Sequence, residues 1–234
     1  MHPLDNVIWN ALTTSQVHLG ASCGTARRFL SDVSLLGGFS KLSDGAYDSL
    51  STLTAVGERV ALFLEADPQP PWNWKVVASV PLLQMIYENG NAPVSSEATP
   101  HTFHQLGEAD VPEMMTLTKL TKPGPFARRT REMGDYFGIR RDGTLVAMAG
   151  ERLRLPGFTE ISAVCTHPEH LGRGYARQLI TLVLSRIRGR GEQAFLHVRE
   201  DNTRAVELYE RLGFRKRVLL RYALLSKTAD FSGD

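Results

Sequence analysis

The residues best suited to chemistry form the stretch 166–177, which reads Thr-His-Pro-Glu-His-Leu-Gly-Arg-Gly-Tyr-Ala-Arg. Glycine lets a backbone turn tightly and approach a ligand with no Cβ in the way. An apolar helical pattern begins directly afterwards. The first amides of a helix have no internal partner and lie at the positive end of its dipole. Together with Arg173 and Arg177, such amides are typical of an anion site, most often one for a phosphate.

Two common phosphate-binding patterns are absent from this loop. The dinucleotide pattern G-x-G-x-x-G needs a third glycine where Arg177 stands, and the chain has no P-loop sequence G-x-x-x-x-G-K-[ST]. A tight strand-to-helix turn without any ligand would use the same glycines. The loop by itself therefore leaves both interpretations open.

The helix after the loop has the clearest periodicity in the chain. Its apolar residues recur at the spacing of one helical face and are Ala176, Leu179, Ile180, Val183, Leu184 and Ile187. A strand is expected at 193–198, and Asp201-Asn202-Thr203 offers N-cap residues to a second helix that ends at Gly213. Another strand, expected at 159–166, leads into the glycine loop.

The other elements predict a mixed α/β chain. Apolar runs at 136–140 and 145–150 flank Asp142-Gly143, which indicates a hairpin. Further expected elements are helices at 4–20 and 108–120 and strands at 59–64, 74–80 and 215–225. The sequence thus predicts three antiparallel strands before the glycine loop, followed by alternating helices and strands.

A polar, small-residue stretch at 89–101 reads as a linker. It divides the chain into an N-terminal α/β half at 1–95 and a second domain at 101–234. The segments 57–61 and 143–147 both begin with glycine and open a strand. One interpretation is that the similarity is accidental, because hairpins generally look alike. The other interpretation is a decayed internal duplication.

Two blocks of the second half resemble the GNAT superfamily of N-acetyltransferases. Gly174-Tyr175-Ala176 matches the end of the family's Q/R-x-x-G-x-G/A pattern, although Leu171 replaces its Gln or Arg. Residues 202–214 are similar to the family signature N-x-x-A-x-x-x-Y-x-x-x-G-F. The resemblance covers roughly 106–225 and implies a mixed, mostly antiparallel central sheet with helices on both faces.

The resemblance also implies acetyl-CoA as co-substrate and a place for each part of it. The backbone of Val164, Cys165 and Thr166 would pair with the pantetheine arm, and Asn202 would touch that arm as well as cap its helix. The diphosphate would lie on the loop residues Leu171, Gly172, Arg173, Gly174, Tyr175, Ala176 and Arg177.

Acyl transfer needs a neutral amine, a polarised thioester carbonyl and a proton for the leaving thiolate. Tyr209 matches the family's catalytic tyrosine and is the candidate acid; it also shares a helical face with Val206 and Leu212, as a core aromatic would. Glu160 resembles the position of the family's general base, and a chain of waters is the alternative. A main-chain amide near Val164 would polarise the carbonyl.

Composition and spacing exclude several other classes of protein. The chain has 234 residues and a formal net charge of +2, too balanced for a general nucleic-acid binder. Its longest apolar run, 76–87, is too short and too interrupted to span a membrane, so a cytoplasmic protein is expected. The pair His167 and His170 lacks further ligands, so no metal is expected, and Cys165 reads as a core thiol.

The sequence therefore predicts a transferase that moves an acetyl group from acetyl-CoA to a primary amine of a small molecule. Basic and aromatic residues at 122–131, among them Phe126, Arg128, Arg129 and Arg131, suggest an acceptor with a carboxylate, such as an amino acid. A non-catalytic acyl-CoA sensor and a nucleotide-binding protein of another fold are the alternatives. The first half could complete the acceptor pocket, be a decayed copy or form the surface of a homodimer.

Overall fold

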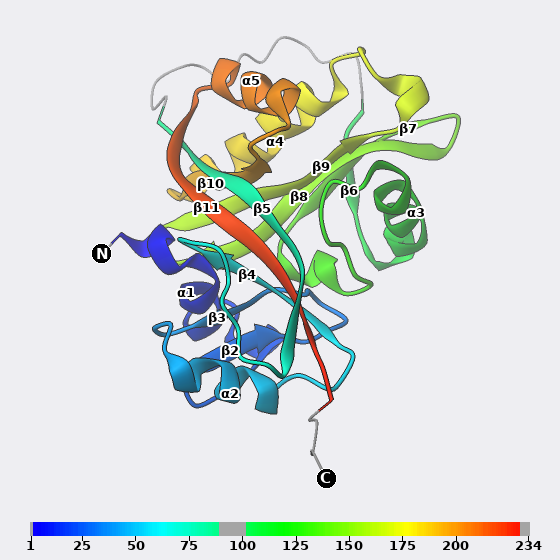
Figure 1. The fold of residues 1–234 in the computed structure, drawn as a ribbon. Helices are drawn as coiled ribbons and strands as arrows, with labels where there is room; N and C mark the ends of the chain where they lie inside the picture. The colour runs from blue at the N-terminus through cyan, green and yellow to red at the C-terminus, as the bar shows by residue number, and fades with distance from the viewer. Residues whose placement is uncertain (1, 89–101, 230–234) are drawn as a thin grey trace.

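The computed structural model describes residues 2–88 and 102–229. The predicted linker at 89–101 lies outside these residues. An eight-stranded sheet dominates the described part (Figure 1), in the order β4-β11-β5-β10-β9-β8-β7-β6. Its strands are β4 (Arg59–Leu64), β5 (Trp74–Tyr87), β6 (His104–Leu106), β7 (Tyr136–Arg141), β8 (Thr144–Leu155), β9 (Phe158–Thr166), β10 (Gln193–Arg199) and β11 (Phe214–Lys227).

Neighbouring strands of this sheet are antiparallel except for β9 and β10, which run parallel. The turn Asp142-Gly143 joins β7 to β8, with both residues at positive φ, as the hairpin prediction requires. The mostly antiparallel sheet and its helices confirm the predicted fold class.

Helices cover both faces of the large sheet. The α4 helix (Tyr175–Gly189) and the α5 helix (Thr203–Arg211) share one core cluster with strand residues such as Leu196. The α1 helix (Val7–Thr13) and the α3 helix (Val111–Thr121) pack against the opposite face, in separate clusters. A second sheet of β1 (Gly20–Cys23), β2 (Ala26–Phe29) and β3 (Gly37–Phe39) carries the α2 helix (Asp44–Thr52).

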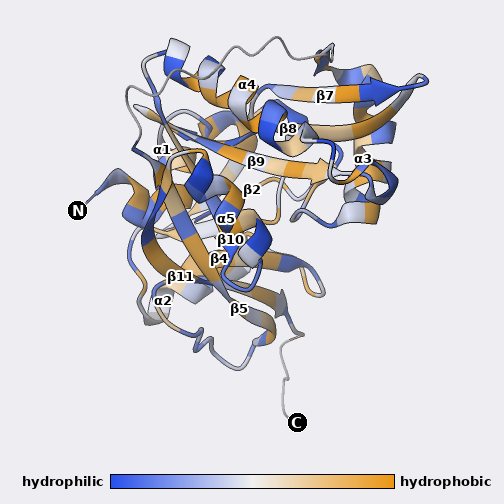
Figure 2. Cartoon of the chain, turned by 90° about the horizontal axis from the view of Figure 1, so that it is seen from above, coloured by the Kyte–Doolittle hydropathy of each residue, from blue (hydrophilic) through white to orange (hydrophobic). Residues whose placement is uncertain are grey.

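The predicted apolar face of α4 is the face that packs on the sheet. Leu179, Ile180, Val183 and Ile187 are fully buried there. Burying a side chain of this size stabilises a fold by about 1.5–3 kcal/mol relative to exposure. Figure 2 shows the hydrophobic colour concentrated on the strands, while α5 and many turns are hydrophilic. The packing fixes α4, and with it the glycine loop, against β8 and β9.

The first half contributes two strands to the same sheet as the second half. β5 lies between β10 and β11, and its residues Leu82–Ile86 pair with Arg199–Phe195 of β10. The strand expected at 74–80 therefore extends to Tyr87, because strand partners on both sides continue it. The division of the chain into domains at 1–95 and 101–234 stays a prediction.

The helix expected at 4–20 is shorter than its pattern suggested. It comprises a 3₁₀ turn at Pro3–Asn6, then α1, then a second 3₁₀ turn at Val17–Leu19. Thr13 and Thr14 donate their hydroxyls to the carbonyls of Trp9 and Asn10. Such local bonds compete with the helical ladder, and α1 ends there.

Candidate active site

The glycine loop is open to solvent and its geometry suits an anion. Gly172 and Gly174 adopt left-handed φ values of +78° and +76°, which favour glycine. Gly174 is the N-cap of α4, and no side chain caps the helix. A Cβ built at Gly172 would meet no atom within 4 Å. The first amides of an α-helix have no partner within the helix, so an uncapped N-terminus of this kind suits an external acceptor such as a diphosphate oxygen.

The strands β9 and β10 separate just before this loop. Their parallel pairing joins Phe158–Ile161 to Gln193–Leu196 and ends there, although β9 continues to Thr166 and β10 to Arg199. Beyond Ile161, β9 keeps pairing with β8 alone, through Cys165 and Thr166. In the described chain, no strand pairs with the other edge of 164–166. That edge offers free main-chain groups to an extended ligand.

Ala163 marks the point of divergence. Its φ is +52°, a left-handed conformation that residues other than glycine rarely adopt, and the β8–β9 register shifts between Met148 and Gly150 beside it. A register shift of this kind is a β-bulge, which bends a strand and re-aims the residues that follow. The bulge accounts for the departure of β9 from β10.

Tyr209 and Asn202 both lie on the α5 side of this opening. Tyr209 is 8% exposed and packs edge-on against Phe214 at 6.0 Å between ring centroids. Burial raises the pKa of Tyr209 to about 12, so its hydroxyl keeps its proton. Asn202 accepts a hydrogen bond from the amide of Ala205 at 3.2 Å, as an N-cap does. Tyr209 is thus a core residue whose protonated phenol remains compatible with the role of an acid.

Glu160, the candidate base, is fully buried in an ion pair. Arg152 donates Nε to Oε2 at 2.9 Å and Nη2 to Oε1 at 2.7 Å, and His197 Nδ1 lies 2.7 Å from Oε1. Burial alone would raise the pKa of Glu160, but Arg152 and His197 outweigh burial and lower it to about 2. Glu160 is therefore an ionised carboxylate, and both of its oxygens already take part in hydrogen bonds.

A row of polar side chains continues from Glu160 across the sheet. His197 Nε2 lies 3.1 Å from Gln84 Nε2, and the same amide nitrogen donates to the Leu4 carbonyl at 3.1 Å. Arg217 Nη1 donates to Gln84 Oε1 at 2.7 Å. Sequence reasoning missed Arg152, His197 and Gln84. Their signal was weak: His197 and Gln84 are polar residues within apolar stretches, and Arg152 is one of several charged residues near the end of β8. Only the strand register reveals that they share a face.

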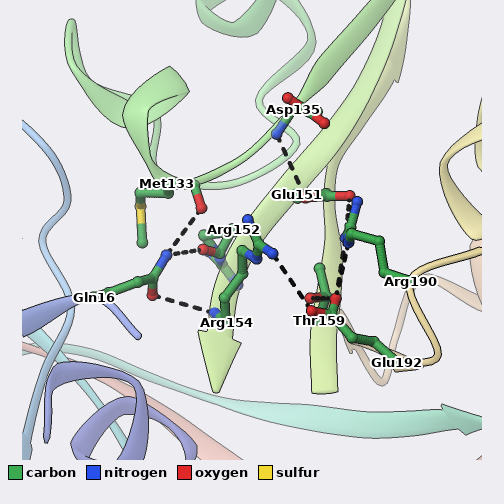
Figure 3. Close-up of polar contacts among 9 residues, drawn as sticks. All are labelled: Gln16, Met133, Asp135, Glu151, Arg152, Arg154, Thr159, Arg190 and Glu192. Carbon is green, nitrogen blue, oxygen red and sulfur yellow. Dashed lines mark hydrogen bonds and ion pairs between the residues drawn. The ribbon is translucent and has the colours of Figure 1, made fainter. Parts of the chain in front are cut away.

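Further contacts hold the strand that carries Arg152 (Figure 3). On one side, Gln16 Nε2 donates to the carbonyls of Met133 and Arg152 at 2.9 and 2.7 Å. On the other, the buried Glu151 accepts from Arg190 at 2.8 Å. These contacts fix the backbone of β8 on both sides of Arg152, whose guanidinium is paired with Glu160.

A groove lies beside α3. It has a volume of about 500 Å³ and is lined by Met115, Thr116, Thr118, Lys119, Lys122, Gly124 and Phe126. A second pocket, too small to hold a water molecule, lies between Phe126 and the strand residues Ser162 and Ala163. Two arginines expected to read an acceptor carboxylate are already paired: Arg129 with Asp32 and Glu132, and Arg131 with Glu108. Lys119 and Lys122 line the groove instead.

The buried thiol of Cys165 and a possible metal site are the other candidates. Cys165 is 6% exposed, and burial raises the pKa of its thiol to about 11. Across residues 2–88 and 102–229, no cluster of three or more His, Cys, Asp or Glu side chains is placed to hold a metal ion. No helix within those ranges is long and apolar enough to cross a membrane.

Comparison with known proteins agrees with the fold. A family model described as FR47-like protein matches residues 136–223. A crystal structure from Novosphingobium aromaticivorans, described as an acetyltransferase from the GNAT family, is 39% identical with a TM-score of 0.89, and the match covers 98% of this chain and 100% of that one.

Curated relatives point the same way. N-alpha-acetyltransferase RimI of Mycobacterium tuberculosis is 34% identical over 53% of this chain and 84% of its own length. An uncharacterised protein of Mycobacterium leprae is 31% identical over 63% of this chain, which spans only 43% of that protein. Shorter matches include mycothiol acetyltransferases, such as that of Thermobispora bispora, at 36% identity over 35% of this chain and 30% of that protein.

An open helix N-terminus beside two diverging parallel strands, on a mostly antiparallel sheet, defines an acyl-CoA-binding acetyltransferase fold. With a relative at 39% identity along its whole length, the chain belongs to the GNAT family, whose acetyltransferases use acetyl-CoA as co-substrate.

Proposed function

We propose that this protein transfers the acetyl group of acetyl-CoA to the primary amine of a small molecule, by direct attack within a ternary complex. One observation carries the proposal: the uncapped amides of α4 and the free edge of β9 lie at the same opening of the sheet. A diphosphate needs the first, and an extended amide-containing arm needs the second.

The residues present fit coenzyme A. The amides of 171–177 and the side chains of Arg173 and Arg177 would hold the diphosphate, and the backbone of 164–166 would pair with the pantetheine arm. Asn202 already caps α5, so any contact with the arm would be additional. Bound there, the coenzyme supplies an activated acetyl thioester.

Tyr209 is our candidate acid. A thiolate leaving group needs a proton, and a phenol whose pKa is raised to about 12 by burial holds one at any physiological pH. The carbonyl of the thioester would be polarised by a main-chain amide of β9 near Val164, where the strand has no partner on the β10 side.

The groove at α3 is our candidate acceptor site. It shares Gly124 and Phe126 with the small pocket that contains Ala163, and its two lysines, Lys119 and Lys122, favour a negatively charged group on the acceptor. The relative RimI is named an N-alpha-acetyltransferase. An α-amine next to a carboxylate, as in an amino acid, satisfies both observations. A cytoplasmic location and a homodimer stay predictions.

Release of free thiol from acetyl-CoA tests the proposal. Amino acids and their amides serve as paired acceptors, because the amide lacks only the carboxylate. We expect turnover with an α-amine, and a lower KM for the amino acid than for its amide. Binding of coenzyme A without turnover for any amine would favour the alternative, a non-catalytic acyl-CoA sensor.

The Tyr209→Phe variant separates catalysis from packing. It retains the ring and removes the hydroxyl, so we expect kcat to fall by about 10²–10⁴ while the affinity for coenzyme A is unchanged. The matched control is Tyr47→Phe, which removes a hydroxyl that is buried and unpartnered in the first half of the chain. Equal activity of Tyr209→Phe and wild type would remove Tyr209 from the mechanism.

A further inference from the structure

His197 lies where the sheet opens. It is the first residue of β10 beyond the last parallel pair, Leu196 with Ile161. Leu196 and Val198 share a core cluster with Tyr209, whereas Phe195 belongs to the cluster on the opposite face. Because side chains alternate along a strand, His197 points to the face opposite Tyr209. The two side chains thus flank the opening from opposite sides.

The contacts of His197 define its tautomer. The oxygen of Gln84 accepts from Arg217 and its nitrogen donates to the Leu4 carbonyl, which orients the amide. That nitrogen therefore also donates to His197 Nε2, which must be unprotonated. The ring proton then lies on Nδ1 and is donated to Glu160 at 2.7 Å. This assignment follows from the hydrogen-bond network.

Glu160 is badly placed to accept a proton itself. One oxygen faces Arg152 and His197, and the other faces Arg152 and the amide of Leu153 at 3.3 Å. Burial does not separate the two groups, because the side chains of Glu160 and His197 are 0% and 1% exposed, so the choice rests on their hydrogen bonds. An imidazole whose Nδ1–H is held by a carboxylate presents the Nε2 lone pair in a fixed direction, as in other enzymes that use a carboxylate–histidine pair as a base.

We propose that His197 is the general base of acetyl transfer and that Glu160 is its positioning residue. This inference rests on the proposed function and refines the role first expected for Glu160. The His197 side chain is 1% exposed and Gln84 covers its Nε2, so the Gln84 amide must move aside before an acceptor can reach that atom. The ammonium of the acceptor then gives one proton to Nε2. The neutral amine then forms the C–N bond as the C–S bond breaks.

Tyr209 and His197, on opposite faces of the sheet, together account for the protons of the reaction. Tyr209 protonates the departing thiolate, and the proton that the new amide nitrogen sheds restores the phenol through water. The proton held by His197 passes to solvent, so one amine-derived proton is released per turnover. This matches conversion of an ammonium and a thioester into an amide and a thiol.

The surroundings of His197 keep it neutral and ready to accept a proton. Burial lowers the pKa of its imidazole, Glu160 on β9 raises it, and Arg152 on β8 and Arg217 on β11 lower it, with a net shift downward. Arg217 is itself paired with Asp5, which precedes α1. From β4, the uncharged ring of Phe63 lies 4.5 Å from the imidazole centroid.

The variant His197→Gln tests the assignment with two acceptors. Glycinamide is largely an ammonium at pH 7 and needs a base, whereas methoxyamine is already neutral. We expect kcat with glycinamide to fall by about 10²–10⁴ and kcat with methoxyamine by less than about tenfold, with unchanged coenzyme A affinity. The matched control, His18→Gln, removes an exposed histidine of the first half and should behave as wild type.

Equal losses with both acceptors, or no loss with glycinamide, would overturn the role of His197 and leave the proposed function intact. No turnover by the wild-type protein with any amine would overturn both. The wild-type protein gives a further test that does not depend on the variant folding. The kcat with glycinamide should rise with pH as His197 loses its proton. Because the pKa of its imidazole is lowered, the plateau should be reached below about pH 6.5. A rise that continues to the acceptor's own pKa, about 8, would refute the assignment.

Nitrogen-15 NMR of the protein without coenzyme adds a readout independent of turnover. We expect a neutral ring with its proton on Nδ1 at pH 7. A proton on Nε2 in the neutral ring, or a doubly protonated ring, would contradict the geometry on which the proposal rests. Glu160→Gln should shift this tautomer equilibrium as well as lower kcat, because a neutral amide can also donate to the ring.

Discussion

Replacing Arg152 with methionine isolates the charge that holds Glu160. Methionine is shorter but has a comparable volume and no charge, so most of the space stays filled while both hydrogen bonds to the carboxylate disappear. Glu160 is left fully buried, with His197 and the Leu153 amide as its remaining partners. An uncompensated buried carboxylate is strongly destabilising.

The expected magnitude follows from two independent routes. Removing one partner of a buried ion pair typically costs about 3–5 kcal/mol. The pKa of Glu160 is lowered from 4.5 to about 2. At roughly 1.4 kcal/mol per pKa unit, this shift corresponds to about 3 kcal/mol of stabilisation. For a chain of this size, 1 kcal/mol shifts Tm by about 2–4 °C. We therefore expect Arg152→Met to lower Tm by about 6–20 °C at neutral pH.

The loss should depend on pH with a definite sign. A carboxyl whose pKa is lowered by folding contributes its full stabilisation above its unfolded value, 4.5, and loses it as pH falls toward about 2. The wild-type protein should therefore lose stability over this interval. The variant lacks the contribution at any pH, so the difference between the two proteins should shrink as the solution is acidified.

Urea unfolding of both proteins between pH 7 and pH 3 measures this difference. The matched control is Arg211→Met, which removes an exposed pair with Glu207 and should change the free energy of unfolding by less than about 0.5 kcal/mol. Two results would refute the reasoning: a variant as stable as wild type at pH 7, or a difference that is constant with pH.

The glycine loop and the buried thiol provide two more predictions. Gly174→Ala strains a backbone at φ +76° by roughly 1–2 kcal/mol, which favours a loop relaxed away from this conformation in the free protein. Because coenzyme A must restore the conformation on binding, its affinity measured by calorimetry should fall by about 5–30-fold; unchanged affinity would mean that binding does not need this loop conformation. Cys165, with a pKa of about 11 and 6% exposure, should react with iodoacetamide at pH 8 far more slowly than the partly exposed Cys23 until the protein is unfolded. Comparable rates for the two thiols in the folded protein would contradict its burial.

The second half of the chain was predictable because its patterns are local. The apolar repeat from Ala176 to Ile187 sets the buried face of α4, and Asn202 caps α5 as its residue type favours. The two glycines of the loop occupy the left-handed positions that only glycine adopts without strain. These preferences act over a few residues, so they can be read without knowing the fold.

The first half was predictable only as a set of elements. Its strand β5 pairs with β10 and β11, which lie more than a hundred residues further along the chain. Nothing in the sequence of a strand states which partners it takes, since main-chain hydrogen bonds are common to all residues. The sharing of one sheet by both halves therefore appeared only in the structure.

The residues themselves determined where an anion could bind and which helix would present it, because glycine conformation, helix dipole and apolar periodicity are properties of short segments. Tertiary structure alone decided what surrounds Glu160. Arg152, His197 and Gln84 come from β8, β10 and β5, and strand register brings them onto one face of the sheet. Burial there would by itself raise the pKa of Glu160, but Arg152 and His197 outweigh burial, so the glutamate stays ionised beside the histidine at neutral pH.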